Sequence, residues 1–104
     1  MPEDTTYRLR SQEFEWDEAK ADSNRRRHGI PFRVAASVLF DVDAIYGLDD
    51  RDEYGEVREW VVGMPLARPR LIHVVYTERG SRYRIISAWK ADANERHAYS
   101  RRGV

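Results

Sequence analysis

The chain of 104 residues contains no cysteine, which excludes disulfide bonds and thiolate metal sites and fits a reducing compartment. Long apolar runs are absent as well, so no stretch approaches the length of a membrane span, and the N-terminus lacks a signal-peptide core. Lysine is rare: of the 18 basic residues only Lys20 and Lys90 are lysines, and the others are arginines. These absences predict a soluble, cytoplasmic protein with one modest core.

The motifs of several enzyme classes are also missing. The sequence has no Gly-rich phosphate loop and no nucleophile elbow, and no two of its histidines have metal-ligand spacing. The acidic loop at residues 49–56 lacks the glycine placement of a calcium loop. We therefore expect neither a metal nor another cofactor.

The charge is balanced, with 18 acidic and 18 basic residues, which argues against a uniformly basic surface. The basic residues are nevertheless almost all arginines, whose planar, two-pronged guanidinium suits phosphate or carboxylate ligands. A GC-rich coding genome would produce the same bias, so composition leaves both explanations open.

Periodicity and turn residues predict an α+β fold over residues 13–104, preceded by a flexible N-terminal arm over residues 1–12. Short links between consecutive strands favour a small antiparallel β-sheet packed on one face by two N-terminal helices and a C-terminal helix. We expect strands at 14–16, 44–48, 58–63, 70–77 and 82–89, with helices at 17–28, from 31 to about 40 and from 92 to about 102. Asp17, Gly29 and the Asp92/Glu95 pair stand at capping positions.

The most informative stretch runs from Val74 to Lys90 and reads as a β-hairpin with a tight turn at 79–81. Arg79, Arg82 and Arg84 surround this turn. Several guanidiniums on a stiff hairpin can hold a phosphate in one place, so a nucleic-acid backbone is the first ligand to consider. The alternative is a hairpin whose arginines are simply solvated.

Alternation divides the last strand into Arg84, Ile86 and Ala88 on one side and Tyr83, Ile85, Ser87 and Trp89 on the other, but both sets are mixed and do not by themselves show which side faces the helices. We expect Ile86 and Ala88 in the core, which leaves Ser87 and Trp89 for the other face. Trp60 and Trp89 could then stack an unpaired base, although ordinary core packing is the alternative for Trp60.

The three histidines differ in context. His28 precedes a C-cap glycine and is expected to serve the helix end, while His97 lies on the last helix, at the surface or an interface. His73 lies within an apolar strand, where a buried structural histidine is the usual outcome and a general acid or base is the alternative.

Blocks of residues in a fixed order make this chain resemble the BrnT family of bacterial toxins over about residues 14–100. Any single block would be weak support, but the order of the blocks is specific. The matching positions are Phe14-Glu-Trp-Asp17, Lys20, Asn24, His28-Gly29, Phe32, Ala35-Ala36, Arg58, Gly63, Val74 to Gly80, Arg84 to Ala88, Lys90-Ala91, Glu95-Arg96 and Tyr99.

The resemblance implies the toxin half of a type II toxin–antitoxin pair. Such proteins have a RelE-like ribonuclease fold and arrest growth by cleaving RNA without a metal. The implied partner is a BrnA-type antitoxin with a ribbon-helix-helix element, so that DNA is contacted only through the antitoxin and the complex represses its own operon. An antitoxin that masks an arginine-lined face should be acidic, and the polar first helix with residues 25–27 and the last helix are candidate contacts.

Metal-free RNA cleavage requires the ribose 2′-hydroxyl to attack the adjacent phosphate while cations stabilise the charge that develops. Arg58, Arg79 and Arg84 match arginine positions of the family, and the resemblance assigns them phosphate binding and transition-state stabilisation.

Proton transfer is less clearly assigned, and its candidates are Glu59, His73 and Tyr76. The expected RNA contacts are Trp60, Trp89 and Lys90.

One position departs from the family, which usually has Arg where this chain has Trp89. Two alternatives to an active ribonuclease therefore stand. The chain could be a catalytically weakened or inactive member that binds the antitoxin in operon autoregulation, or it could be a plain RNA-binding module.

Overall fold

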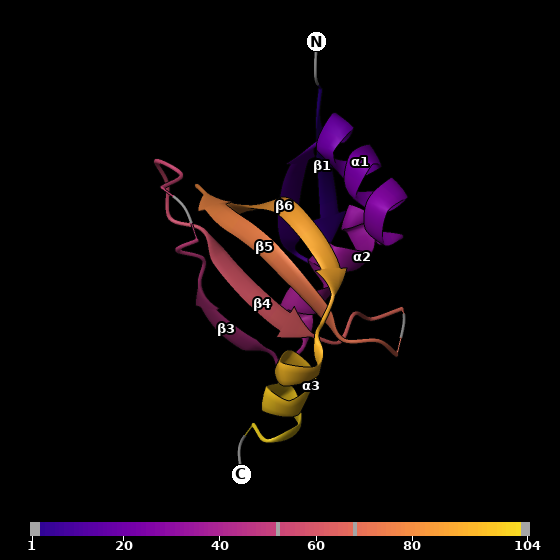
Figure 1. The fold of residues 1–104 in the computed structure, drawn as a ribbon. Helices are drawn as coiled ribbons and strands as arrows, with labels where there is room; N and C mark the ends of the chain where they lie inside the picture. Colours follow the sequence, from indigo (N-terminus) through magenta and orange to yellow (C-terminus); the bar gives the residue numbers. More distant parts are fainter. Residues whose placement is uncertain (1–2, 52, 68, 103–104) are drawn as a thin grey trace.

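The computed structural model describes residues 3–51, 53–67 and 69–102, which form a six-stranded sheet with three α-helices and one short 3-10 helix (Figure 1). Across the sheet the strands run in the order β1-β2-β6-β5-β4-β3. The elements are β1 (Asp4–Leu9), β2 (Gln12–Asp17), α1 (Glu18–His28), α2 (Phe32–Ser37), η1 (Val38–Phe40), β3 (Ile45–Leu48), β4 (Glu59–Gly63), β5 (Ile72–Arg79), β6 (Arg82–Lys90) and α3 (Ala93–Ser100). Within these described ranges, no helix combines the length and apolar character that crossing a bilayer requires.

The predicted α+β class is confirmed, but the sheet is not wholly antiparallel. Strands β2 and β6 run parallel, with Glu13 opposite Arg82 and Glu15 opposite Arg84. Short links force neighbouring strands to be antiparallel, whereas β2 and β6 are joined by most of the chain, which allows either direction.

The N-terminal segment differs from the flexible arm that we expect for residues 1–12. Residues 4–9 form the edge strand β1, which pairs with β2, while residues 1 and 2 lie outside the described part. Thr5, Tyr7 and Leu9 are half-buried and alternate with exposed residues, and Tyr7 packs on Trp16 with ring centroids 5.7 Å apart. This alternation of period two was present in the sequence, but polar neighbours obscured it.

The helix caps that the sequence predicts are confirmed. The side chain of Asp17 accepts a hydrogen bond from the Lys20 backbone at 3.0 Å, and Gly29 ends α1 in the left-handed conformation, with φ of 72°. Asp92 and Glu95 form a reciprocal capping box at the start of α3.

The hydrophobic core lies between one face of the sheet and the first two helices. Helices α1 and α2 contact β6 and the β1–β2 hairpin, whereas α3 contacts β4 at the end of the sheet (Figure 1). Fully buried side chains from both layers form one cluster, which includes Phe14, Ile30, Ala35, Val74 and Ala88.

A β-bulge interrupts the pairing of β5 and β6. Val75 pairs with Ser87 and Tyr76 pairs with Ile85, so Ile86 has no residue opposite it. One extra residue in β6 shifts the alternation of all side chains beyond it.

The bulge changes which side chains of β6 face the helices. Ile85 and Ala88 both belong to the buried core, whereas Ile86 is only half-buried, so the prediction of a core Ile86 is wrong. It also places Arg84 and Trp89 on the same face of the sheet, although odd and even positions of an unbulged strand would point to opposite faces.

Asn24 makes hydrogen bonds to the part of β6 that lies beyond its pairing with β2. Its amide nitrogen donates to the Ala88 carbonyl at 2.8 Å, and its amide oxygen accepts from the Ala88 N–H at 3.1 Å. Because β2 pairs with β6 only at residues 82–84, this buried side chain satisfies backbone groups that a neighbouring strand would otherwise bind.

We predict that Asn24→Ala lowers the free energy of unfolding by about 2–4 kcal/mol, because it leaves two buried backbone groups of β6 without partners. Asn94→Ala, the same change at an exposed position of α3, is the control and should cost no more than about 0.5 kcal/mol. Urea unfolding of both variants tests this, and equal stabilities would show that Asn24 is dispensable.

Candidate functional site

The side of the sheet opposite α1 and α2 carries Trp60, His73 and Trp89, and we call it the outer face. Cross-strand pairing fixes this assignment, since His73 lies directly opposite Trp89, and Val74, one residue further, lies opposite Ala88 in the core. In Figure 1 this face of β4, β5 and β6 is not covered by α1 or α2.

A column of rings crosses the outer face. The imidazole of His73 stacks on Trp89 with centroids 4.4 Å apart and on Trp60 with centroids 5.7 Å apart. The indole of Trp60 covers Gly47 so closely that a Cβ there would lie 2.3 Å from the ring. At the other end, the guanidinium of Arg51 lies 5.4 Å from the centroid of the Trp89 ring.

This column changes the expected role of the two tryptophans. Trp60 and Trp89 are not adjacent to each other, because His73 lies between them. Trp60 also covers Gly47, and Trp89 also lies near the Arg51 guanidinium and the His28 ring, whose centroid is 6.3 Å away, so a base that stacked on Trp89 would compete with these groups. Trp60 is half-buried on the outer face and is absent from the core cluster.

His73 is bonded to a carboxylate from α3. Nδ1 of His73 is in close hydrogen-bond contact with Oε2 of Glu95, while Oε1 of Glu95 accepts the Asp92 backbone N–H at 3.0 Å. An ionised carboxylate can only accept hydrogen bonds, so Nδ1 keeps its hydrogen and donates a hydrogen bond to Glu95. The sequence indicated only the capping function of Glu95 and did not reveal its contact with His73.

Next to this pair lies a hollow that sequence reasoning did not find. Its lining includes Arg51, whose guanidinium donates to Asp49 at 2.7 and 2.9 Å. These hydrogen bonds hold the pKa of Asp49 below its usual range despite burial. Leu48, Asp50, Trp60, His73 and Glu95 complete the lining. Arg51 was missed because it lies in an acidic loop, where no local pattern marks it.

The predicted arginines lie nearer the hairpin turn, and two of them share one carboxylate. Arg58 donates to Glu56 at 3.2 Å and Arg79 donates to the other oxygen of Glu56 at 3.1 Å. Although burial opposes the shift, the two guanidiniums hold the pKa of Glu56 below its usual range. Arg58 also stacks on Tyr54, 3.9 Å from the ring centroid.

Arg84 is bound by carboxylates from both N-terminal strands. Its guanidinium donates to Asp4 of β1 at 3.0 and 3.1 Å and to Glu15 of β2 at 2.6 Å. Arg82 lies beside them, 3.7 Å from both Glu13 and Glu15. The hydrogen bonds from Arg84 hold the pKa of Asp4 below its usual range.

Two predicted proton-transfer residues lie on the other side of the sheet. Tyr76 is buried in the core and its hydroxyl donates to Glu59 at 3.3 Å. Burial, reinforced by the Glu59 charge, raises the pKa of Tyr76 far above its usual value. The structure therefore does not bring Glu59 and Tyr76 together with the arginines. Lys90 is exposed and pairs with the core residue Ile72, so it points away from Trp89.

The outer face thus carries two separate clusters. Arg84 lies opposite Thr77, which is four residues along β5 from His73. Arg58 is likewise displaced by four residues, because His73 lies opposite Val62. Four residues of strand span about 13 Å. The arginines around the hairpin turn and the His73–Glu95 pair are on one face but cannot grip a single phosphodiester together.

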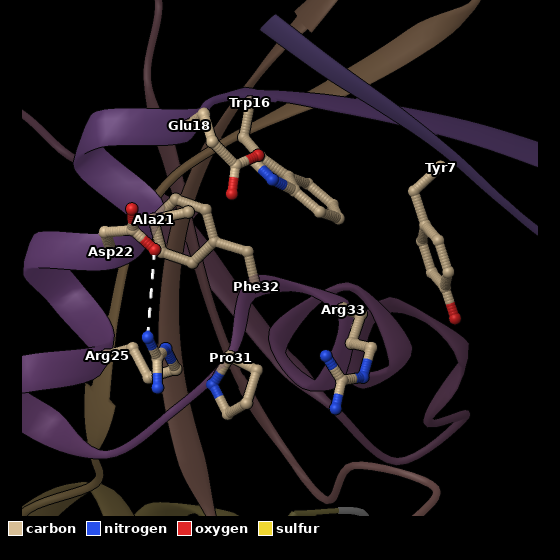
Figure 2. Close-up of a pocket in the computed structure, with 9 residues that line it drawn as sticks. All are labelled: Tyr7, Trp16, Glu18, Ala21, Asp22, Arg25, Pro31, Phe32 and Arg33. Carbon is tan, nitrogen blue, oxygen red and sulfur yellow. Dashed lines mark ion pairs between the residues drawn. The ribbon is translucent and has the colours of Figure 1, made fainter. Parts of the chain in front are cut away.

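A second hollow lies on the helix side, between α1, α2 and the β1–β2 hairpin (Figure 2). Tyr7, Trp16 and Phe32 line it together with charged residues of α1, where Arg25 lies 3.8 Å from Asp22. None of the predicted catalytic or RNA-binding residues lies there. Among the described residues, no group of three His, Cys, Asp or Glu side chains could hold a metal ion.

We predict that Arg84→Ala lowers the free energy of unfolding at pH 7 by about 1–3 kcal/mol, because it leaves the largely buried Glu15 carboxylate without its closest partner. The folded-state pKa of Asp4 is depressed, so its stabilising pairing with Arg84 is complete above the unfolded pKa of about 3.9 and is lost as the pH falls through the lower folded value. The deficit should therefore shrink below about pH 4.

Denaturant unfolding at pH 7 and pH 3 tests this prediction. Arg8→Ala is the control, because the side chain of Arg8 is 61% exposed and its pair with Glu13 is correspondingly weak. A deficit of Arg84→Ala that stayed constant with pH would contradict the assigned role of Asp4.

Comparison with known proteins identifies the family of the chain. No curated protein matches the sequence. A family described as "Ribonuclease toxin, BrnT, of type II toxin-antitoxin system" matches residues 16–95. That description implies an RNA target and an antitoxin partner for the family. Because the match covers most of the chain, from the end of β2 into α3, the protein belongs to the BrnT family of type II toxin–antitoxin ribonuclease toxins.

Proposed function

We propose that this protein is an RNA endonuclease that cleaves without a metal and binds its substrate on the outer face. Support comes from its membership of a ribonuclease family. The observation that carries the proposal is that Arg58, Arg79 and Arg84 project from the same face as His73. RNA lying along β5 would meet the arginines at one end and the His73–Glu95 pair at the other.

The reaction needs only groups of the RNA and the chain, together with water. The ribose 2′-oxygen attacks the adjacent phosphorus, the O2′–P bond forms and the P–O5′ bond breaks, and the departing 5′-oxygen takes a proton from water, which leaves a 2′,3′-cyclic phosphate and a 5′-hydroxyl. A base accepts the 2′-hydroxyl proton and a cation beside that base stabilises the charge on the phosphate oxygens, while Arg58, Arg79 and Arg84 hold neighbouring phosphates of the RNA. Of the three proton-transfer candidates, His73 alone lies on the outer face, so the proposal omits Glu59 and Tyr76.

The arginines would bind RNA by exchanging anions. Arg58 and Arg79 contact Glu56, and Arg84 contacts Asp4 and Glu15, so a phosphate must replace a carboxylate at each guanidinium. The displaced carboxylates stay nearby and repel the RNA. We therefore expect modest, salt-sensitive affinity.

The proposed partner is a BrnA-type ribbon-helix-helix antitoxin, through which alone the complex would contact DNA. An acidic segment of the antitoxin would satisfy the arginines of the outer face. The exposed residues 25–27 of α1 and the exposed side of α3 are further candidate contacts. A RelE-like fold is part of the same proposal.

A second candidate function is a non-cleaving member that binds the antitoxin in operon autoregulation. The observation that favours it is Trp89, which stacks 4.4 Å from His73 where the family usually has Arg. Trp89→Arg separates the two functions, since a gain of toxicity would show that the native chain lacks the chemistry.

We predict that the purified protein cleaves single-stranded RNA in EDTA and that Arg79→Ala weakens RNA binding. Because one phosphate contact is lost, the slope of log affinity against log salt should fall by about 0.7. Arg79 is half-exposed and its pair with Glu56 contributes little stability, so the variant should remain folded.

Arg25→Ala is the matched control, because Arg25 is also at least half-exposed and weakly paired but lies on α1. Binding with the wild-type salt slope would argue against the outer face. Absence of cleavage by the wild-type protein alone would refute the ribonuclease, whereas binding without cleavage would favour a plain RNA-binding module.

A further inference from the structure

The cluster formed by His73, Glu95 and Arg51 lies apart from the arginines around the hairpin turn. We infer that Glu95 is a positioning residue, which holds His73 in the one neutral form that can accept a proton from RNA. The inference rests on the proposed function, and it adds a residue from α3 to a site otherwise built from the sheet.

Glu95 determines which imidazole nitrogen is protonated. Its Oε2 contacts Nδ1 of His73, which must therefore donate a hydrogen bond. A neutral imidazole has one N–H and one bare nitrogen, so Nε2 is left with a free lone pair. This is the form that a general base requires.

The orientation of the imidazole is fixed by its neighbours. Trp89 stacks on one side with an interplanar angle of 13°, and Trp60 stacks on the other with an angle of 27°. Only 11% of the His73 side chain is exposed. The ring is therefore held in place by packing, and Glu95 is left to select the position of the proton.

Glu95 is itself held at both ends. Its Oε1 accepts the Asp92 N–H at 3.0 Å, and its own backbone N–H donates to the Asp92 side chain at 2.8 Å. The capping box thus fixes the carboxylate on the first turn of α3, and the second oxygen is directed at His73. Glu95 thus caps α3 through one carboxylate oxygen and binds the imidazole of His73 through the other.

The hollow beside His73 is also lined by Arg51, which provides the cation that cleavage needs. Nε2 of His73 would take the 2′-hydroxyl proton as the O2′–P bond forms, and the departing 5′-oxygen would take a proton from water as the P–O5′ bond breaks. The resulting imidazolium lies against the Glu95 carboxylate, which stabilises it. Arg51, whose side chain is 59% exposed and lines the hollow, would neutralise charge on the phosphate once the phosphate replaces Asp49 at its guanidinium.

Glu95→Gln tests this inference without removing the cap. Glutamine also serves at this position of a capping box, where its carbonyl oxygen accepts the Asp92 N–H. Its NH2 group then faces His73 and makes Nδ1 the acceptor, which moves the proton to Nε2. We expect ¹⁵N NMR of the His73 imidazole to report the opposite tautomer, and kcat for RNA cleavage to fall about 100-fold with little change in KM.

Glu78→Gln is the matched control. It makes the same substitution on β5, the strand that carries His73, but at an exposed position that pairs with Tyr83 on the other face of the sheet. This variant should keep the wild-type tautomer and the wild-type kcat. Thermal unfolding of both variants checks that α3 remains in place.

Each outcome decides between the two claims. Reversal of the tautomer together with the loss of kcat supports the positioning role. An unchanged tautomer, or a reversed tautomer with full activity, overturns it while leaving the ribonuclease intact. A wild-type protein that cleaves no RNA overturns the proposed function itself, whatever the NMR spectrum shows.

Discussion

One unpaired residue in β6 determines what the outer face can carry. Because Ile86 has no partner across the strand, Arg84 and Trp89 project from the same side of the sheet, and Ile85 and Ala88 both enter the core. An unbulged strand would place Arg84 on the side opposite His73. Bulges are often found near active sites, where they redirect a side chain. Here the bulge turns Arg84 to the face that Arg79 already shares with His73.

The balanced charge of the chain has a structural counterpart on the outer face. The guanidiniums of Arg58, Arg79 and Arg84 are each within hydrogen-bond distance of at least one carboxylate, from Glu56 or the N-terminal strands. Such pairing keeps the face close to neutral and limits long-range attraction of RNA. Specific contact then depends on local exchange of anions rather than on a strong surface field. The same arrangement gives an acidic partner protein little to gain unless it also displaces those carboxylates.

Local signals in the sequence predicted more of the fold than of the site. The caps at Asp17 and Asp92 depend on residues within one helical turn, so they could be read directly. The bulge could not, because Ile85 and Ile86 are identical side chains and alternation alone does not locate an extra residue. The contact of Glu95 with His73 spans 22 residues, and no local pattern encodes such a contact. Without the bulge, alternation groups Arg84 with the core positions, so neither its place on the outer face nor its carboxylate partners could be predicted.

The parallel pairing of β2 with β6 joins the beginning of the chain to its end. Glu15 and Arg84 are 69 residues apart, and their hydrogen bond links the N-terminal hairpin to the rest of the sheet. During synthesis, the β1–β2 hairpin emerges from the ribosome first, but β2 has no partner on its other edge until β6 has left the exit tunnel. Contacts between distant residues form late because of the entropy lost in closing long loops. A nascent chain of this protein therefore cannot complete its outer face until β6 has been synthesised, so Arg84 meets Glu15 only after all the strands between them have been made.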